Sequence, residues 1–487
     1  MGVRIGGDSL NPITSGELDA EIAAATQNQP GPVVVPGIPV PIQTATPPAA
    51  PNTGSVQGGD KMAAQMKLNQ ALTDELAFKA GRLGLDEADT AKLKKVLNNL
   101  PPDKFDRAVR LFEDAMQSGD KVSAMRTFIN IEPMAASHPD RITPEIERAL
   151  VMGVGAARVE GAYAGTKGGT GVMGYDAADR AARTLFNMPE SEYKVIAGAL
   201  ENAGQGGGPK ASAGTEQALI LKAVAARQSQ FNDPSWAKAN AGKPDVHMSP
   251  TWEISHYADA IRGKDRSDLV EKSTVQDLSS PEGSNALQQR FNDSCAPTSA
   301  QITEAESDPV TALKMHTEGI HSTSSKGDIG WAQKITLNND GGLAVPRDPK
   351  ERDPHGPVKG QGLYPNQYAQ VLNQIASPVT NRVYHPEMVD DSAKARTAML
   401  DKIEPLLRDR IEVPIGVFWD NGGGHALTIT QMAGDKPNRQ YLITDPWNGK
   451  TGWVLESDIV KGHTDFFAGH GRLGEAFPSV PKLDKVD

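Results

Sequence analysis

Four short runs near the C-terminal end of the chain constrain the fold more than any other sequence feature. They are VPIGVFWD (413–420), HALTITQM (425–432), RQYLITDP (439–446) and GWVLES (452–457). Each has the length of a strand and is rich in β-branched and aromatic residues, and turn-forming residues separate them. This pattern predicts an antiparallel meander. Because mostly helical sequence precedes it, the order of elements predicts an α+β fold.

The segment 61–275 is expected to be mostly α-helical, as one or two small bundles that a glycine-rich stretch at 152–175 would divide. One buried helical face is predicted by the 3.6-residue spacing of Leu93, Val96, Leu97 and Leu100. Asp86 is the expected N-cap of that helix, and Pro101 ends it. Thr143, followed by a proline, predicts a second N-cap.

Residues 25–60 are rich in Pro, Gly, Thr and Gln, as in PGPVVVPGIPVPIQTATPPAAPNTGSVQGG. Such a composition buries little apolar surface, so we expect a disordered or extended tail. The expected organisation is therefore a tail over 1–60, a helical region over 61–275, an α+β domain over 280–470 and a C-terminal tail over 471–487.

The charge and the cysteine content exclude several functions. The chain has 61 acidic against 50 basic residues and a net charge of −11, which argues against a nucleic-acid binder. Its single cysteine excludes an internal disulfide. We expect neither a Sec-type signal peptide nor a transmembrane helix, because no apolar run is long enough.

His425 and Asp445 are the first candidates for chemistry. The loop between their two runs is centred near residue 435 or 436, so a hairpin would place the two residues opposite or nearly opposite each other. A carboxylate at that spacing binds one imidazole nitrogen and sets the tautomer.

Cys295 begins CAPTSAQI, a sequence that predicts the start of a helix with a proline in its first turn. The positive end of a helix favours a thiolate, and a nearby imidazolium favours it further. Cys295, His425 and Asp445 would then form a nucleophilic triad. Gln289 is the candidate side-chain oxyanion donor, with the neighbouring Gln288 as the alternative.

The two motifs QRFNDSCAPTSAQI and HALTITQMAGDKPNRQYLITDPW together resemble the C39 and C39-like papain-fold cysteine peptidases over residues 280–470. The resemblance implies a papain-like domain in which an N-terminal helix carries the cysteine and a C-terminal antiparallel sheet carries the histidine and the aspartate. It implies Cys295 as nucleophile, His425 as general base and acid, Asp445 as orienting acid and Gln289 as oxyanion donor. Two departures are Ala296, where the family usually has glycine, and the long Cys-to-His separation.

The resemblance implies a thiol protease that hydrolyses peptide amides through a thioester, without a cofactor. Two alternatives keep the fold: an amidase or deamidase acting on another amide such as peptidoglycan, and a non-enzymatic interaction protein. With no signal peptide, we expect a protein of the bacterial cytoplasm or an effector or toxin that a specialised secretion system exports. The N-terminal half would then bind a secretion-system component or a chaperone, or restrain the peptidase until it cuts at a glycine-rich site.

Other polar groups are expected to be structural. His316 with His321, and His463 with His470, lack the spacing of a zinc site. The acidic cluster Glu304, Glu306 and Asp308 is expected to be a solvated helix face. Trp447 and Trp453 are interpreted either as the lining of a substrate groove or as core residues.

Overall fold

The computed structural model divides the chain into two compact units, residues 1–60 and 61–487. It describes residues 57–155, 172–203, 205, 213–231, 249–264, 274–275, 282–283, 286–290, 294–319, 336–337, 343–344, 363–420, 423–464 and 471–482. The expectations for residues 25–56 and for most of the glycine-rich stretch at 152–175 fall outside the described residues.

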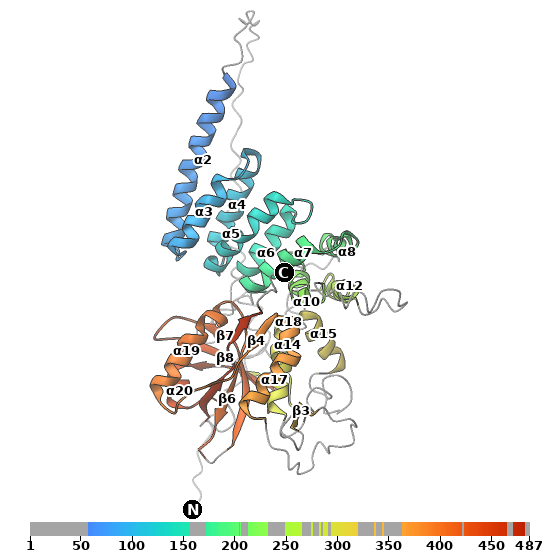
Figure 1. Cartoon of the computed structure of the whole chain (residues 1–487), viewed down its shortest axis with the longest axis vertical. Coiled ribbons are helices and arrows are strands. Elements are labelled where there is room, and N and C mark those ends of the chain that lie inside the picture. Colours follow the sequence, from blue (N-terminus) through green and yellow to red (C-terminus); the bar gives the residue numbers. More distant parts are fainter. Residues whose placement is uncertain are drawn as a thin grey trace, which may run out of the picture. The chain divides into compact units, whose positions relative to one another are not determined.

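The first part of the second unit is helical, as the sequence predicts (Figure 1). Its elements are α2 (Gln57–Arg82), α3 (Glu87–Asn98), α4 (Pro102–Gln117), α5 (Lys121–Ser137), α6 (Pro144–Gly155), α7 (Tyr175–Asn187), α8 (Glu190–Glu201), α9 (Ala213–Ala226), α10 (Gln228–Phe231) and α12 (Pro250–Ile261). Asp86 caps α3 by accepting from the Asp89 N–H, and Thr143 accepts from the Ile146 N–H at the start of α6. Both predicted caps are confirmed.

The helical part contains two hydrophobic cores. One lies among α2 to α5 and includes Leu93, Phe112 and Phe128. The other extends from the end of α5 to α12 and also takes in Val310, which belongs to the part of the chain that follows Cys295. Because α5 and α6 contribute to both cores, the described residues give no division into two independent bundles at the glycine-rich stretch.

The second part is α+β. Its helices are α14 (Cys295–Ser307), α15 (Pro309–Glu318), α17 (Pro365–Ile375), α18 (Ser377–Thr380), α19 (Ala393–Arg408) and α20 (Glu456–Lys461). Its strands are β1 (Glu282–Gly283), β2 (Thr336–Leu337), β3 (Leu343–Ala344), β4 (Arg382–Tyr384), β5 (Glu387–Met388), β6 (Val413–Phe418), β7 (Gly424–Ala433), β8 (Gln440–Asp445), β9 (Lys450–Leu455), β10 (Arg472–Ala476) and β11 (Ser479–Pro481). The four predicted strands are β6 to β9, and they begin and end within a few residues of the expected positions.

The main sheet is antiparallel and has the strand order β1-β9-β8-β7-β6-β10-β5. Helices cover both of its faces (Figure 1). On one face α19 and α20 bury Ile415, Leu427 and Ile443, and on the other α14 and α17 pack over Ala426 and Phe477. The central strands are therefore buried on both sides, which explains their nearly continuous apolar character.

Two expectations differ from the structure. Residues 472–481 were expected in a C-terminal tail, but they form β10 and β11, which pair with β6, β5 and β4. The acidic cluster on α14 was expected to face solvent, but Asp308 is fully buried and Glu306 nearly so. Asp308 binds the guanidinium of Arg227, on the far side of the helical core, at 2.7 Å. A long-range ion partner of this kind leaves no local sequence pattern.

A close contact between Gly174 and Asp409 joins the helical part to the sheet part. The Asp409 carboxylate accepts the Tyr175 N–H at 2.5 Å and the Asp176 N–H at 3.2 Å, so it caps α7 from 234 positions away. Gly174 itself provides no side-chain cap. A Cβ atom on Gly174 would lie 1.8 Å from the Asp409 carbonyl oxygen, so the two backbones approach this closely only because residue 174 is glycine.

Gly174→Ala should therefore destabilise the protein by about 2–4 kcal/mol, since the new methyl group must displace backbone. Gly198→Ala is the matched control, because no atom lies within 4 Å of its added Cβ and the residue sits inside α8. That change should stabilise by about 0.5–1 kcal/mol through helix propensity. Urea unfolding of both variants measures the difference, and equal effects would contradict the proposed close contact.

Candidate active site

Cys295 is the first residue of α14, and the hydroxyl groups of this helix fix it on the sheet. Ser299 Oγ donates to the Ala426 carbonyl at 3.1 Å, and Thr428 Oγ1 donates to the Ser299 carbonyl at 3.2 Å. These two reciprocal bonds hold the first turn of α14 against the start of β7. The N-terminus of the helix, with its partial positive charge, therefore lies beside His425.

His425 is the second residue of β7, and its Nε2 lies 2.7 Å from Asp445 Oδ1 at the end of β8. The side chains are 3% and 0% exposed, so the interaction is buried. Asp445 Oδ1 also accepts the Trp447 N–H at 2.8 Å. Cys295 also acts on this ring, because its negative charge is among the causes that raise the pKa of His425. Since Nε2 is engaged by the carboxylate, Nδ1 is the ring nitrogen left for the thiol.

The structure brings the two predicted residues together, but not by the predicted register. Ile429 pairs with Ile443, so continuing this register places Asp445 opposite Leu427, two residues along β7 from His425. The two residues therefore lie nearly opposite each other and are not directly paired. His425 and Asp445 form a diagonal pair on one face of the sheet, which long side chains can bridge.

A β-bulge at Thr430 makes this diagonal pair possible. The ladder pairs on its two sides are Ile429 with Ile443 and Gln431 with Leu442. If the register that pairs Gln431 with Leu442 continued through Thr430, Asp445 would pair with Thr428. Asp445 and His425 would then lie on opposite faces of the sheet. The hydroxyl of Thr430 donates to the Leu442 carbonyl at 3.3 Å across the strands.

The environment of His425 favours its protonated form. Burial alone would lower its pKa, but the hydrogen bonds to Asp445 and Cys295, together with their negative charges, outweigh burial and raise the pKa of His425 to about 10. The imidazole ring is therefore positively charged at neutral pH.

Two tryptophan rings flank the imidazole. Trp419 stacks on His425 with ring centroids 6.1 Å apart, and Trp447 meets it edge-on at the same distance. Trp447 is 37% exposed, so its ring forms part of the surface beside the site. Of the two tryptophans predicted for a groove, only Trp447 contacts the imidazole. Trp419 was not predicted to lie at the site, and nothing in the sequence VPIGVFWD distinguishes it from a residue of an ordinary strand.

Gln289 lies next to the triad through its backbone. Its N–H donates to the Pro446 carbonyl at 2.7 Å, directly after Asp445. Gln288, the alternative oxyanion donor, instead donates through its side-chain Nε2 to the Trp447 carbonyl at 3.2 Å. This contact occupies the side-chain amide of Gln288, so Gln289 is the better candidate for the oxyanion donor.

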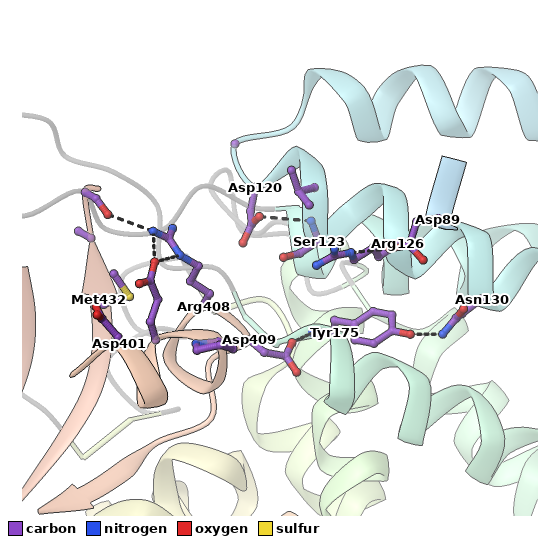
Figure 2. Close-up of a pocket in the computed structure, with 16 residues that line it drawn as sticks. Asp89, Asp120, Ser123, Arg126, Asn130, Tyr175, Asp401, Arg408, Asp409 and Met432 are labelled. Atoms are coloured by element: carbon purple, nitrogen blue, oxygen red, sulfur yellow. Dashed lines mark hydrogen bonds and ion pairs between the residues drawn. The ribbon is translucent and has the colours of Figure 1, made fainter. Parts of the chain in front are cut away.

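A pocket of about 870 Å³ lies elsewhere in the second unit (Figure 2). Asp89, Arg126 and Tyr175 line one side of it, and Arg408 and Met432 line the other. Both arginines are held by carboxylates, Arg126 by Asp86 and Asp89 and Arg408 by Glu404 and Asp435. Met432 is seven residues along β7 from His425, about 23 Å in an extended strand. The pocket is therefore separate from the candidate active site.

In the part of the chain that the structure describes, no group of three His, Cys, Asp or Glu side chains is arranged to hold a metal ion. His316 Nε2 donates to the Thr274 carbonyl oxygen at 2.7 Å, while His321 and His470 lie outside the described residues. No helix within the same described part is both long and apolar enough to cross a membrane.

No family model, no curated protein and no solved structure matches this chain.

The raised pKa of His425 gives a pH prediction. Because the folded value of about 10 lies above the ordinary 6.5, the stabilisation from the charged ring is fully present below pH 6.5 and is lost as pH rises through about 10. Asp445→Asn should lower the midpoint, because it removes the charged acceptor. Asp435→Asn, in the exposed turn of the same hairpin, is the control. NMR titration of the ring measures both, and a wild-type midpoint near 6.5 would contradict the prediction.

Proposed function

We propose that the protein is a cysteine peptidase with a papain-like domain, which hydrolyses peptide amides through a thioester intermediate. The single observation that carries the proposal is the buried His425–Asp445 pair, in which Nε2 lies 2.7 Å from Oδ1. The influence of Cys295 on the pKa of the same imidazole supports it. The resemblance of the Cys295 and His425 sequence motifs to C39-like peptidases supports the same reading, as does the chain order Cys, His, Asp.

In the proposed reaction, the Cys295 thiolate attacks the carbonyl carbon of the substrate, and the C=O electron pair moves onto oxygen. When the tetrahedral intermediate collapses, the C–N bond breaks and the His425 imidazolium gives its proton to the leaving amine. The products of this half are a thioester on Cys295 and the free amine. Neutral His425 then takes a proton from water as the water oxygen attacks the thioester carbon. The C–S bond breaks, which releases the carboxylic acid product and regenerates the Cys295 thiolate beside the His425 imidazolium.

The remaining residues have supporting roles. Asp445 binds Nε2 and so orients Nδ1 toward the thiol. The Cys295 backbone N–H at the start of α14 and the Gln289 side-chain amide would bind the developing oxyanion. The Trp419 and Trp447 rings on two sides of His425 reduce water access to the His425–Asp445 bond, which strengthens it.

The same triad also serves deamidation or acyl transfer, because these reactions differ only in the leaving amine and the acceptor. A glutamine deamidase would release ammonia and add about 1 Da to its substrate, whereas a peptidase would cut the chain. Mass analysis of substrate proteins incubated with the enzyme separates these outcomes.

The central test is alkylation of Cys295 by iodoacetamide at pH 6, with wild type and His425→Ala compared. Wild type should react at least tenfold faster, because the imidazolium stabilises the thiolate. Intact-mass measurement after exposure to an activated acyl ester should show a thioester on wild type and none on Cys295→Ala. Equal alkylation rates in wild type and His425→Ala would exclude the proposed enzyme.

Gln289 and Gln288 form a matched pair for the oxyanion role. Gln289→Ala should lower kcat by about 10²–10³-fold with little change in KM, as expected for a donor that acts on the transition state. Gln288→Ala should change kcat by less than about threefold, because that side chain binds the Trp447 carbonyl. A larger loss in Gln288→Ala than in Gln289→Ala would reverse the assignment.

A further inference from the structure

Glu132 of α5 and Glu147 of α6 are two buried acids that bind the same arginine, and the proposed mechanism does not use them. Both side chains are 0% exposed. Arg107 of α4 donates from Nη1 to Glu147 Oε2 at 2.5 Å and from Nη2 to Glu132 Oε1 at 3.2 Å. The two carboxyl groups therefore occupy the two terminal nitrogens of one guanidinium, and these three residues are called the Arg107 cluster below.

The Arg107 cluster lies where the two hydrophobic cores of the helical part meet. On α5, Ile129 belongs to the core among α2 to α5, whereas Ile131 belongs to the core that extends to α12. On α6, the neighbours Val151 and Leu150 are divided between the two cores in the same way. The buried residues of α4 belong to the first core. The cluster therefore ties that core to two helices that both cores share.

The charges of the Arg107 cluster do not balance when both acids are ionised. One guanidinium would then face two carboxylates, neither of which reaches water, and an uncompensated buried charge is costly. One proton on the pair removes the excess negative charge, and two carboxyl groups that share a site hold a proton more tightly than an isolated one does. The geometry therefore favours one proton and one negative charge on the two acids at neutral pH.

An unsatisfied oxygen atom indicates the same proton. Among the described residues, Glu147 Oε1 has no hydrogen-bond partner, although its side chain is fully buried. A carboxylate oxygen only accepts, so an ionised Glu132 supplies no donor for this atom. A protonated Glu132, held beside Glu147 on the same guanidinium, has an O–H group that can donate. Buried acceptors without a donor are rare in native proteins, so a shared proton explains both the charge and the unsatisfied oxygen.

Lys104 of α4 is a further cation near the pair, but its Nζ donates to the Ala136 carbonyl at 2.7 Å. Other ion pairs on α5 and on the helices packed around it are Arg126 with Asp86 and Asp89, Arg148 with Asp114, Arg180 with Asp176, and Arg183 with Asp179. Burial and the neighbouring Glu147 raise the pKa of Glu132 to about 9, and the positive charges of Arg107 and Lys104 do not offset them.

We propose that Glu132 and Glu147 share one proton at neutral pH, and that this proton acts as a pH-sensitive latch between the two cores of the helical part. When the proton leaves, two carboxylates repel each other around a single guanidinium, and α4 is held less firmly against α5 and α6. The latch belongs to the helical part and does not depend on the peptidase activity proposed above.

The direction of the pH effect follows from the raised pKa. Since the folded value of about 9 lies above the ordinary 4.5, the folded protein keeps a proton that the unfolded chain has released. The stabilisation is fully present below pH 4.5 and is lost as pH rises through about 9. Between these values, one proton changes the equilibrium constant for opening by up to about tenfold per pH unit.

Hydrogen exchange read by mass spectrometry measures the opening of α4, α5 and α6 in the full chain. Wild type and Glu132→Gln are compared at the same pH, so the intrinsic exchange rate of each amide cancels. The glutamine is neutral at every pH and leaves one carboxylate for one guanidinium. The ratio of exchange rates, wild type over Glu132→Gln, should therefore rise by up to about tenfold per pH unit between pH 6 and 8.

Glu253 gives the matched control, because it is the reverse case of one carboxylate between two cations. Arg227 Nε lies 2.9 Å from its Oε2, and Lys314 Nζ lies 2.6 Å from its Oε1. This acid has no excess negative charge to relieve by binding a proton. The exchange ratio of wild type over Glu253→Gln at α4 to α6 should therefore stay constant from pH 6 to 8.

Glu147→Gln and the double variant test whether the proton is shared. Each single variant should remove the whole pH dependence, and the double variant should remove no more, because the two acids titrate as a unit. Infrared spectra at pH 7 give an independent measurement. Wild type should show the C=O stretching band of one protonated carboxyl group that both single variants lack.

The inference would be overturned if either single variant kept the pH dependence of wild type. It would also be overturned if the infrared spectra of wild type and the two single variants showed the same number of protonated carboxyl groups. Two acids that are both ionised at neutral pH would give that second result, and both glutamine variants would then open more readily than wild type at pH 8. The shared proton instead makes both variants open less readily at that pH.

Discussion

The bulge at Thr430 sets the face of the sheet on which β7 and β8 present their side chains to each other. The pairing register between β7 and β8 shifts by one residue at this bulge. Side chains in a strand alternate between faces, so this one residue decides whether His425 and Asp445 meet or lie on opposite sides. The diagonal His425–Asp445 bond, the charge on the imidazole and the neighbouring thiol all depend on that choice.

The helical part supports the same site through α14. At its N-terminal end this helix carries Cys295 and binds β7 through Ser299. At its C-terminal end, Asp308 binds Arg227, which belongs to the segment after α9, at 2.7 Å, with both side chains almost fully buried. Removing Arg227 would leave the buried Asp308 carboxylate without its ion partner, which costs about 3–5 kcal/mol. The helical part therefore supports the helix that carries Cys295.

The sequence predicts the local features of this fold well. The start of α14 follows from a helix-initiating stretch with Pro297 in its first turn, and β6 to β9 follow from their short alternating runs between turns. The Asp86 cap of α3 is also local, since it accepts from the N–H three residues on. Each of these depends on neighbours within a few residues, which a sequence pattern records.

The features that the sequence does not reveal are contacts between distant segments. Asp409 caps a helix 234 positions away, Gly174 permits that approach, and Asp308 is buried by an arginine from another region. The bulge also escapes prediction, because a hairpin with loop centre at 435 or 436 is compatible with more than one register.

Glycine and glutamate at positions 416 and 475 illustrate why such pairs matter for chemistry. Neither residue alone indicates a special role. A glycine within a strand usually weakens the strand, and a glutamate on a strand near the sheet edge is expected to face water. Only the ladder shows that the acid occupies the space of the missing side chain, on the face that α14 covers. A side chain at position 416 would collide with the Glu475 carboxyl group, so the glycine and the buried acid depend on each other.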